Sequence, residues 1–133
     1  MTPIFADSSN FVALLCERDE WHELAASYRE ELSHPVITTA FVLVEVGNTL
    51  CPKGWRSVFG AFLTGLRDEP NLQVLPPTQE LYDAGVDLYL NRPDKEWSLT
   101  DCISFVVMGD RAITQALTND HHFEQAGFEI LLK

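Results

Sequence analysis

Hydrophobic positions along the chain alternate between short strand-like runs and longer stretches with a helical period. The strand-like runs are apolar and end at polar or turn residues; they cover residues 3–6, 36–38, 71–75, 113–118 and 129–132. The segments between them place apolar residues at helical spacing. This spacing predicts helices over 10–16, 20–32, Thr39 to about Cys51, 53–67, 78–92 and 98–110, and a short turn or helix over 121–126.

Strands that alternate with helices predict a mostly parallel sheet covered on both faces, which is a three-layer α/β/α sandwich. The chain of 133 residues, 46% hydrophobic and 22% charged, is expected to form a single domain over 1–133. Polar residues at the predicted helix starts are suitable caps: Ser8 or Ser9, Thr39, Thr78 and Ser98.

Four carboxylates stand next to these apolar segments. Asp7 follows the first strand-like run, Glu45 interrupts the segment 41–46, Asp101 opens a helix, and Asp120 follows a late strand. Burying a carboxylate costs several kcal/mol unless a partner offsets it, and a divalent cation is a common partner. Oxygen ligands select hard ions such as Mg²⁺ or Mn²⁺. Because ligands bind beyond the carboxyl ends of parallel strands, one rim of the sheet is expected to collect all four acids.

Each of three acids also has a structural explanation. Asp7 is a suitable cap for the helix that follows it, Asp101 completes a capping box with Ser98, and Asp120 is a suitable cap for 121–126. Glu45 has no such explanation, since it stands in mid-helix between two valines. Capping and metal binding are compatible, so both interpretations stay open.

Three other features suggest chemistry less strongly. Adjacent histidines on a helix point about 100° apart, so His121 and His122 are not expected to share an ion. Cys102 beside Asp101 is expected to be a buried thiol and not a nucleophile. Aromatic residues at Trp55, Phe59 and Phe62 are expected to form a core face or a dimer face.

Composition limits the partners. The formal net charge of −11 argues against bulk attraction to nucleic acid, which leaves Lys53 with Arg56, and Arg92 with Lys95, as local basic patches. Three separated cysteines without a Cys-x-x-Cys pair are expected to be reduced, buried thiols in a cytoplasmic protein. No apolar run approaches the roughly 20 residues of a membrane span, and the N-terminus does not read as a signal peptide.

Several short motifs together resemble those of a known family. The first strand ends in Asp7-Ser8-Ser9, a glutamate (Glu45) lies in the helix after the second strand, and Asp101 opens a late helix. The most specific match is Thr118-Asn119-Asp120, which is followed by an aromatic residue and a glycine. With these motifs the chain resembles PIN domains over nearly its whole length, specifically the VapC-like toxins of bacterial toxin–antitoxin pairs.

The resemblance implies an endoribonuclease that needs Mg²⁺ or Mn²⁺ and cleaves RNA, that often forms a homodimer, and that a small antitoxin protein holds inactive. Asp7 and Asp101 would be central metal ligands, and Glu45 and Asp120 would bind directly or through water. Ser9 and Thr118 would orient metal-bound water or a carboxylate. A catalytically idle PIN domain that acts as a protein-interaction module is the alternative function.

Overall fold

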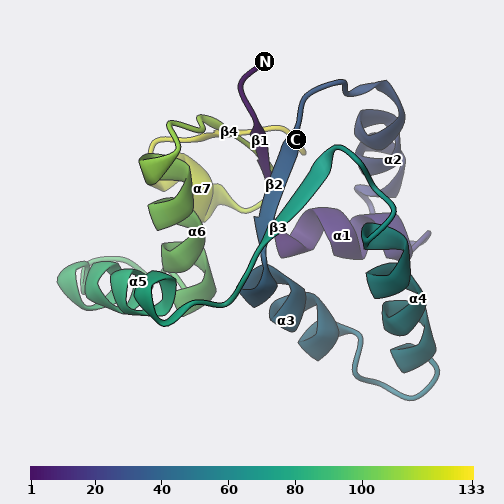
Figure 1. The fold of residues 1–133 in the computed structure, drawn as a ribbon, viewed down its shortest axis with the longest axis horizontal. Coiled ribbons are helices and arrows are strands. Elements are labelled where there is room, and N and C mark those ends of the chain that lie inside the picture. Colours follow the sequence, from purple (N-terminus) through teal and green to yellow (C-terminus); the bar gives the residue numbers. More distant parts are fainter.

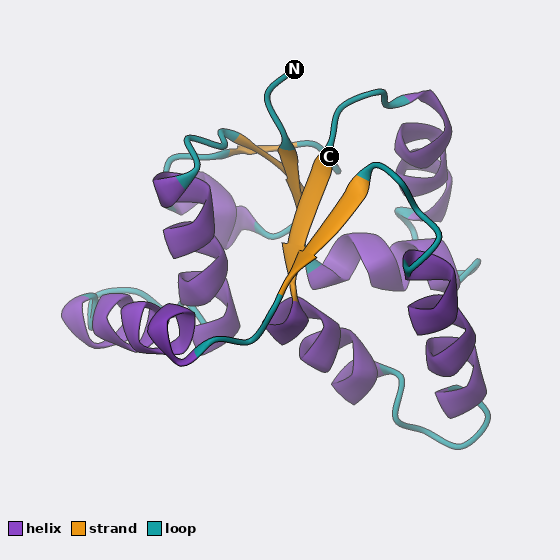
Figure 2. Ribbon diagram, in the orientation of Figure 1, coloured by secondary structure: helices purple, strands orange, loops and turns teal.

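The computed structural model describes all residues, 1–133, and has five strands and seven helices that largely alternate (Figures 1 and 2). The strands are β1 (Ile4–Ala6), β2 (Val36–Thr39), β3 (Leu72–Leu75), β4 (Gln115–Leu117) and β5 (Glu129–Ile130). The helices are α1 (Ser8–Leu15), α2 (His22–Glu31), α3 (Ala40–Thr49), α4 (Arg56–Leu66), α5 (Gln79–Asn91), α6 (Leu99–Asp110) and α7 (His121–Gln125). None of these helices is long and apolar enough to cross a membrane.

All five strands run parallel, in the order β3-β2-β1-β4-β5. Helices α1, α2 and α4 lie on one side of the sheet, and α5, α6 and α7 lie on the other (Figure 1). Helix α3 lies beyond the carboxyl ends of the strands and contacts both α1 and α6. The predicted α/β/α sandwich with a parallel sheet is therefore confirmed.

The strand order places a change of direction beside β1. From β1 the chain moves outward through β2 to β3, and it then returns to the other side of β1 as β4. Ligands of open parallel sheets bind where the strand order reverses, beyond the carboxyl ends of the strands. In this fold that crevice lies between the ends of β1 and β4, directly at Asp7 and Thr118.

An aromatic stack fixes the helices around this crevice. Trp97 and Phe105 meet edge to face at 5.0 Å, and Phe105 meets Phe123 in the same way at 4.9 Å. The Trp97 indole also donates to the Gln125 side chain at 3.0 Å. Because Phe105 belongs to α6 and Phe123 to α7, the stack holds the start of α6 against α7.

Helices α5 and α6 approach each other closely at Gly85. A Cβ atom at this position would lie 2.2 Å from Cγ1 of Ile103, so only glycine fits there. Ile103 is buried two residues after Asp101 in α6. This contact seats the helix that carries Asp101.

Several predicted boundaries were wrong. Helix α1 begins at Ser8, so Ser8 and Ser9 lie inside the helix and Asp7 is at the N-cap position. Helix α4 begins at Arg56 and not at 53, because Gly54 adopts a φ of 93° that ends the preceding turn. The predicted caps Thr39, Thr78 and Ser98 are confirmed, since each side chain accepts a backbone N–H at its helix start.

The last two strands are shorter than the apolar runs that predicted them. Ile113 and Leu132 are buried, yet both lie outside the strands. The N–H of Ile113 donates to Met108 in α6, and that of Leu132 donates to Thr118. At these two positions the apolar pattern correctly indicated burial but wrongly predicted that the residues belong to strands.

Candidate active site at the carboxyl ends of the strands

The four predicted acids come together at one end of the sheet. Asp7 directly follows β1, and its N–H donates to Leu117 of β4 at 3.2 Å. Glu45 comes from α3, Asp101 from the first turn of α6, and Asp120 from the N-cap of α7. The charges of Asp101 and Glu45 act on Asp7, and those of Asp120 and Glu45 act on Asp101, so the acids form one electrostatic cluster.

Asp7 is the most buried of the four, with 3% of its surface exposed. Burial raises the pKa of Asp7 to about 7, because the low-dielectric surroundings disfavour the charged form. The Thr118 hydroxyl, which donates to Asp7 Oδ2 at 2.8 Å, lowers this pKa, while Asp101 and Glu45 raise it. The second oxygen, Oδ1, is buried without any hydrogen-bond partner.

Although Asp7 occupies an N-cap position, its side chain does not cap α1. The structural explanation for this acid is therefore wrong, and its carboxylate faces the cluster instead. Ser9, in the first turn of α1, supports the arrangement, since its hydroxyl lies 3.1 Å from the Thr118 hydroxyl and accepts from the Asn119 N–H at 3.3 Å.

Asp101 and Asp120 act as caps, as their structural explanations predicted. Asp101 and Ser98 form a full capping box, in which Asp101 Oδ2 accepts from the Ser98 N–H at 3.2 Å. Asp120 Oδ1 accepts from the His122 N–H at 2.9 Å. Burial raises the pKa of Asp101, and the charges of Asp120 and Glu45 raise it further. Capping therefore fixes both carboxylates at the rim without neutralising them.

Glu45 is half-buried on α3 and accepts a short hydrogen bond from the Ser8 hydroxyl. Sequence reasoning assigned Ser8 only a capping role, and the pattern gave no signal that α1 and α3 pack together at this point. The contact joins a residue of the first helix to one 37 positions later.

His122 is the other residue that sequence reasoning did not place in the site. Its Nδ1 lies 3.4 Å from Asp101 Oδ2 and 3.3 Å from Asp120 Oδ1. The rings of His121 and His122 are also only 4.4 Å apart, so the expectation that the two imidazoles diverge was wrong. They are the first two residues of a helix of five residues, where both side chains turn back toward the cap.

The donor set fits a divalent cation. Asp101 and Glu45 act electrostatically on the buried Asp7, whose Oδ1 has no hydrogen-bond partner, and Asp120 acts on Asp101. The four acids themselves supply only oxygen donors. Burial, and less strongly the neighbouring carboxylates, raise the pKa of Asp7 and of Asp101, so the charged form of each is disfavoured. A hard cation would supply positive charge at this point, and the aspartates and the glutamate are the residues that would hold it.

Other sequence expectations had mixed outcomes. Cys102 is buried, as expected, and burial raises the pKa of its thiol. Cys51 is exposed and Cys16 half-buried, so the expectation of three buried thiols was wrong. Phe59 and Phe62 pack toward the core, Phe62 at 5.3 Å from Phe11, and Trp55 precedes the helix and is partly exposed.

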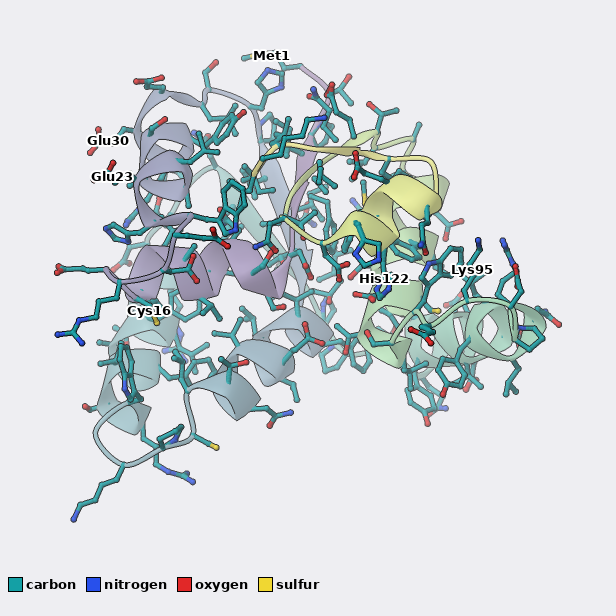
Figure 3. The ribbon with its side chains drawn as sticks, turned by 180° about the vertical axis from the view of Figure 1, so that it is seen from behind. Met1, Cys16, Glu23, Glu30, Lys95 and His122 are labelled. Atoms are coloured by element: carbon teal, nitrogen blue, oxygen red, sulfur yellow. The ribbon has the colours of Figure 1, made fainter.

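Of the predicted basic patches, Arg92 is tied to Asp94 at 3.0 Å and lies over Trp97. Lys95 forms no ion pair and lies on the side of the molecule that carries α5, α6 and α7 (Figure 3).

Comparisons with known proteins agree with this geometry. The sequence matches the PIN domain family over residues 4–129, and the chain therefore belongs to that family. Its fold is that of the VapC-like members: it superposes with a TM-score of 0.84 on the VapC20 toxin of Mycobacterium tuberculosis, described as a toxin that cleaves the sarcin–ricin loop. The two are 26% identical over 94% of this chain and 95% of the other.

More distant structures share the fold alone. VapBC from Salmonella typhimurium, bound to DNA, is 15% identical with a TM-score of 0.68, over 98% of this chain and 97% of the other. FitAcB from Neisseria gonorrhoeae is 14% identical with a TM-score of 0.67, over 96% of each chain. A comparison with curated protein sequences found no match.

Asp7 should make the metal-free protein less stable as pH rises. The folded protein binds the Asp7 proton more tightly than the unfolded chain does, so the free energy of unfolding falls between about pH 4 and pH 7. The loss is at most about 4 kcal/mol, since one pKa unit corresponds to about 1.4 kcal/mol. Chemical denaturation in EDTA at several pH values should show this fall, and Asp7→Asn should flatten it.

The exposed Asp87 on α5 provides a control with the same charge change. Asp87→Asn should keep the parent's pH dependence. If the free energy of unfolding of Asp7→Asn fell with pH as much as that of the parent, Asp7 would not be the destabilising group.

Proposed function

We propose that this chain is a divalent-metal-dependent endoribonuclease, a VapC-like toxin, with Asp7, Glu45, Asp101 and Asp120 as catalytic metal ligands for Mg²⁺ or Mn²⁺. The observation that carries the proposal is the Asp7 carboxylate, which is buried beside other acids with one oxygen lacking a partner. A bound divalent cation lowers the pKa of water and stabilises negative charge on phosphoryl oxygens.

The surrounding side chains hold the acids in position. Thr118 donates to Asp7 and leaves the second carboxylate oxygen free. Ser9 contacts the Thr118 hydroxyl, and Ser8 orients Glu45. The capping hydrogen bonds of Asp101 and Asp120 restrict both side chains before any substrate arrives, which lowers the entropy cost of assembling the site.

The similarity to VapC20 suggests which substrate to test first. VapC20, at 26% identity, cleaves the sarcin–ricin loop, so this ribosomal RNA element is the first substrate to test, with total cellular RNA as the unbiased alternative. The idle interaction module remains the rival, and it predicts neither cleavage nor a requirement for the acids.

The four acids should each be needed for RNA cleavage. With Mg²⁺ or Mn²⁺ present, Asp7→Asn, Glu45→Gln, Asp101→Asn and Asp120→Asn should each lower the cleavage rate at least about 100-fold, because ligands of one site act as a unit. The amide replacements keep the capping and Ser8 hydrogen-bond acceptors, so they remove charge without removing a cap.

Asp87→Asn should cleave RNA at the parent rate, and EDTA should stop the parent. No metal-dependent cleavage of ribosomes, isolated ribosomal RNA or total RNA by the parent would favour the idle module. If the Asp101→Asn variant still cleaved RNA, Asp101 would act only as a helix cap.

An antitoxin partner belongs to the same proposal, and the structure has a surface suited to one. A cleft of about 540 Å³ opens between α1, α2 and α4, and 13 of the 19 residues that line it are hydrophobic. Asn10 lines this cleft and is buried, with its Oδ1 lacking a hydrogen-bond partner. The occupant we propose is an antitoxin segment with an apolar face, a donor for Asn10, and basic residues that complement the net charge of −11.

A charged side chain in the cleft should weaken this complex. Ala61 is exposed on α4 and lines the cleft, whereas Thr64 is exposed on the same helix and does not. With a peptide that carries the apolar face and basic residues described above as the probe, Ala61→Glu should lower affinity at least about 10-fold by calorimetry, as expected when a charge is buried without a partner. Thr64→Glu is the control, and equal binding by both variants would contradict the cleft as the docking surface.

We also propose a homodimer, but on a different face from the one that the sequence suggested. Phe59 and Phe62 face the core, whereas Val44 on α3 and Tyr82 on α5 are exposed, and Tyr82 lies 6.5 Å from Phe41. Apolar side chains of this size on adjacent helices are typical of an interface.

Light scattering at tens of micromolar should find twice the chain mass, and a 15.0 kDa particle would contradict the dimer. Tyr82→Asp should dissociate the dimer and Trp55→Asp should not, because a buried unpaired charge is costly only inside the interface. If Trp55→Asp dissociated the dimer and Tyr82→Asp did not, the interface would lie at Trp55.

A further inference from the structure

Two imidazoles and one carboxylate meet where α7 begins beside α6, and a second carboxylate adjoins them. Ligand atoms of Asp120, His121 and His122 all lie within 4.8 Å of one another. Asp101 adjoins them through His122, whose Nδ1 is 3.4 Å from Asp101 Oδ2. Figure 3 shows His122 on the side of the molecule where α6 and α7 meet.

The spacing of these atoms suits one ion. A tetrahedral metal with bonds of about 2.1 Å has its ligand atoms about 3.4 Å apart. Asp120 Oδ1 is 3.3 Å from His122 Nδ1 and 3.8 Å from His121 Nδ1. Both distances therefore match a tetrahedral edge to within a few tenths of an ångström.

The local fold explains why neighbouring residues converge. His121 and His122 are the first two residues of α7, and Asp120 caps that helix by accepting the His122 N–H. Both imidazoles therefore present Nδ1, the ring nitrogen nearer the backbone, to the same capping carboxylate. An ion pair of His122 with Asp101 and Asp120 would also explain the position of His122, but it would give no role to His121.

We propose that His121, His122 and Asp120 form a mixed imidazole–carboxylate site for a borderline divalent transition metal, with Zn²⁺ and Co²⁺ as the test ions. Asp101 lies beside this site, next to His122. Imidazole nitrogen favours such ions over Mg²⁺, which prefers oxygen and retains its water. The inference deepens the proposed function, because the site shares Asp120 with the proposed catalytic acids. The inference predicts that the end of the acid cluster with the two histidines prefers Zn²⁺ and Co²⁺ to Mg²⁺. The end that contains Asp7 should show no such preference.

The test is metal binding by the full-length protein, with no RNA present. Calorimetry should show Zn²⁺ binding at least about 100-fold tighter than Mg²⁺. Co²⁺ should give visible absorption bands of the strength expected for a four-coordinate ion with nitrogen ligands. The double variant His121→Ala/His122→Ala should lower Zn²⁺ affinity at least about 10-fold and weaken the Co²⁺ bands, while Mg²⁺ binding stays within a few-fold.

His34→Ala is the matched control, because the His34 ring lies beside Thr2 at the opposite end of β1. It should bind Zn²⁺ like the parent. If the double variant is unstable, His121→Ala alone serves, since 70% of that side chain is exposed. Unchanged Zn²⁺ affinity in the histidine variants, or an equal loss in His34→Ala, would overturn the inference.

The test of the mixed metal site can fail or succeed independently of the test of RNA cleavage. Asp7→Asn should lose RNA cleavage but keep histidine-dependent Zn²⁺ binding. Histidine-dependent Zn²⁺ binding in a parent that cleaves no RNA would refute only the nuclease proposal. RNA cleavage by a parent whose Zn²⁺ binding ignores both histidines would refute only the mixed site.

Discussion

The structure depends on one unfavourable placement, which is a carboxylate buried at the end of the central strand. β1 lies in the middle of a parallel sheet and is buried along its length, so the residue that follows it emerges into the crevice where the strand order reverses. Asp7 occupies that position, and only Thr118 donates a side-chain hydrogen bond to it. Burial disfavours the charged form of this carboxylate, which stands at a place where a parallel sheet binds ligands.

The same hydrogen bonds that begin the late helices also hold the acids. Asp101 closes a capping box and Asp120 caps α7, while the stack of Trp97, Phe105 and Phe123 locks the two helices together. The same contacts therefore both stabilise the fold and arrange the site. A site whose side chains are already restricted by backbone hydrogen bonds reorganises little when a ligand binds.

Charge and surface shape give the chain two different faces. The acid cluster concentrates negative charge at the carboxyl ends of the strands, where the proposed cation would reverse the local repulsion. The apolar cleft of α1, α2 and α4 is lined mostly by uncharged side chains, with Arg29 and Glu69 paired at its edge. An acidic protein can thus present one surface to a phosphate-bearing substrate through metal and another to a protein partner through apolar contact.

The sequence by itself determined the element order, the parallel α/β class and the end of the sheet at which the acids collect. These features follow from local information: apolar spacing separates strands from helices, and Thr39, Thr78 and Ser98 mark helix starts through hydrogen bonds within one turn. The tertiary structure alone decided that Asp7 does not cap α1, that Ser8 reaches Glu45, that His122 lies between Asp101 and Asp120, and that Phe62 faces Phe11. Each of these depends on contacts between residues distant in the chain or on the path of a single turn, and a pattern of hydrophobic positions carries no record of which faces meet.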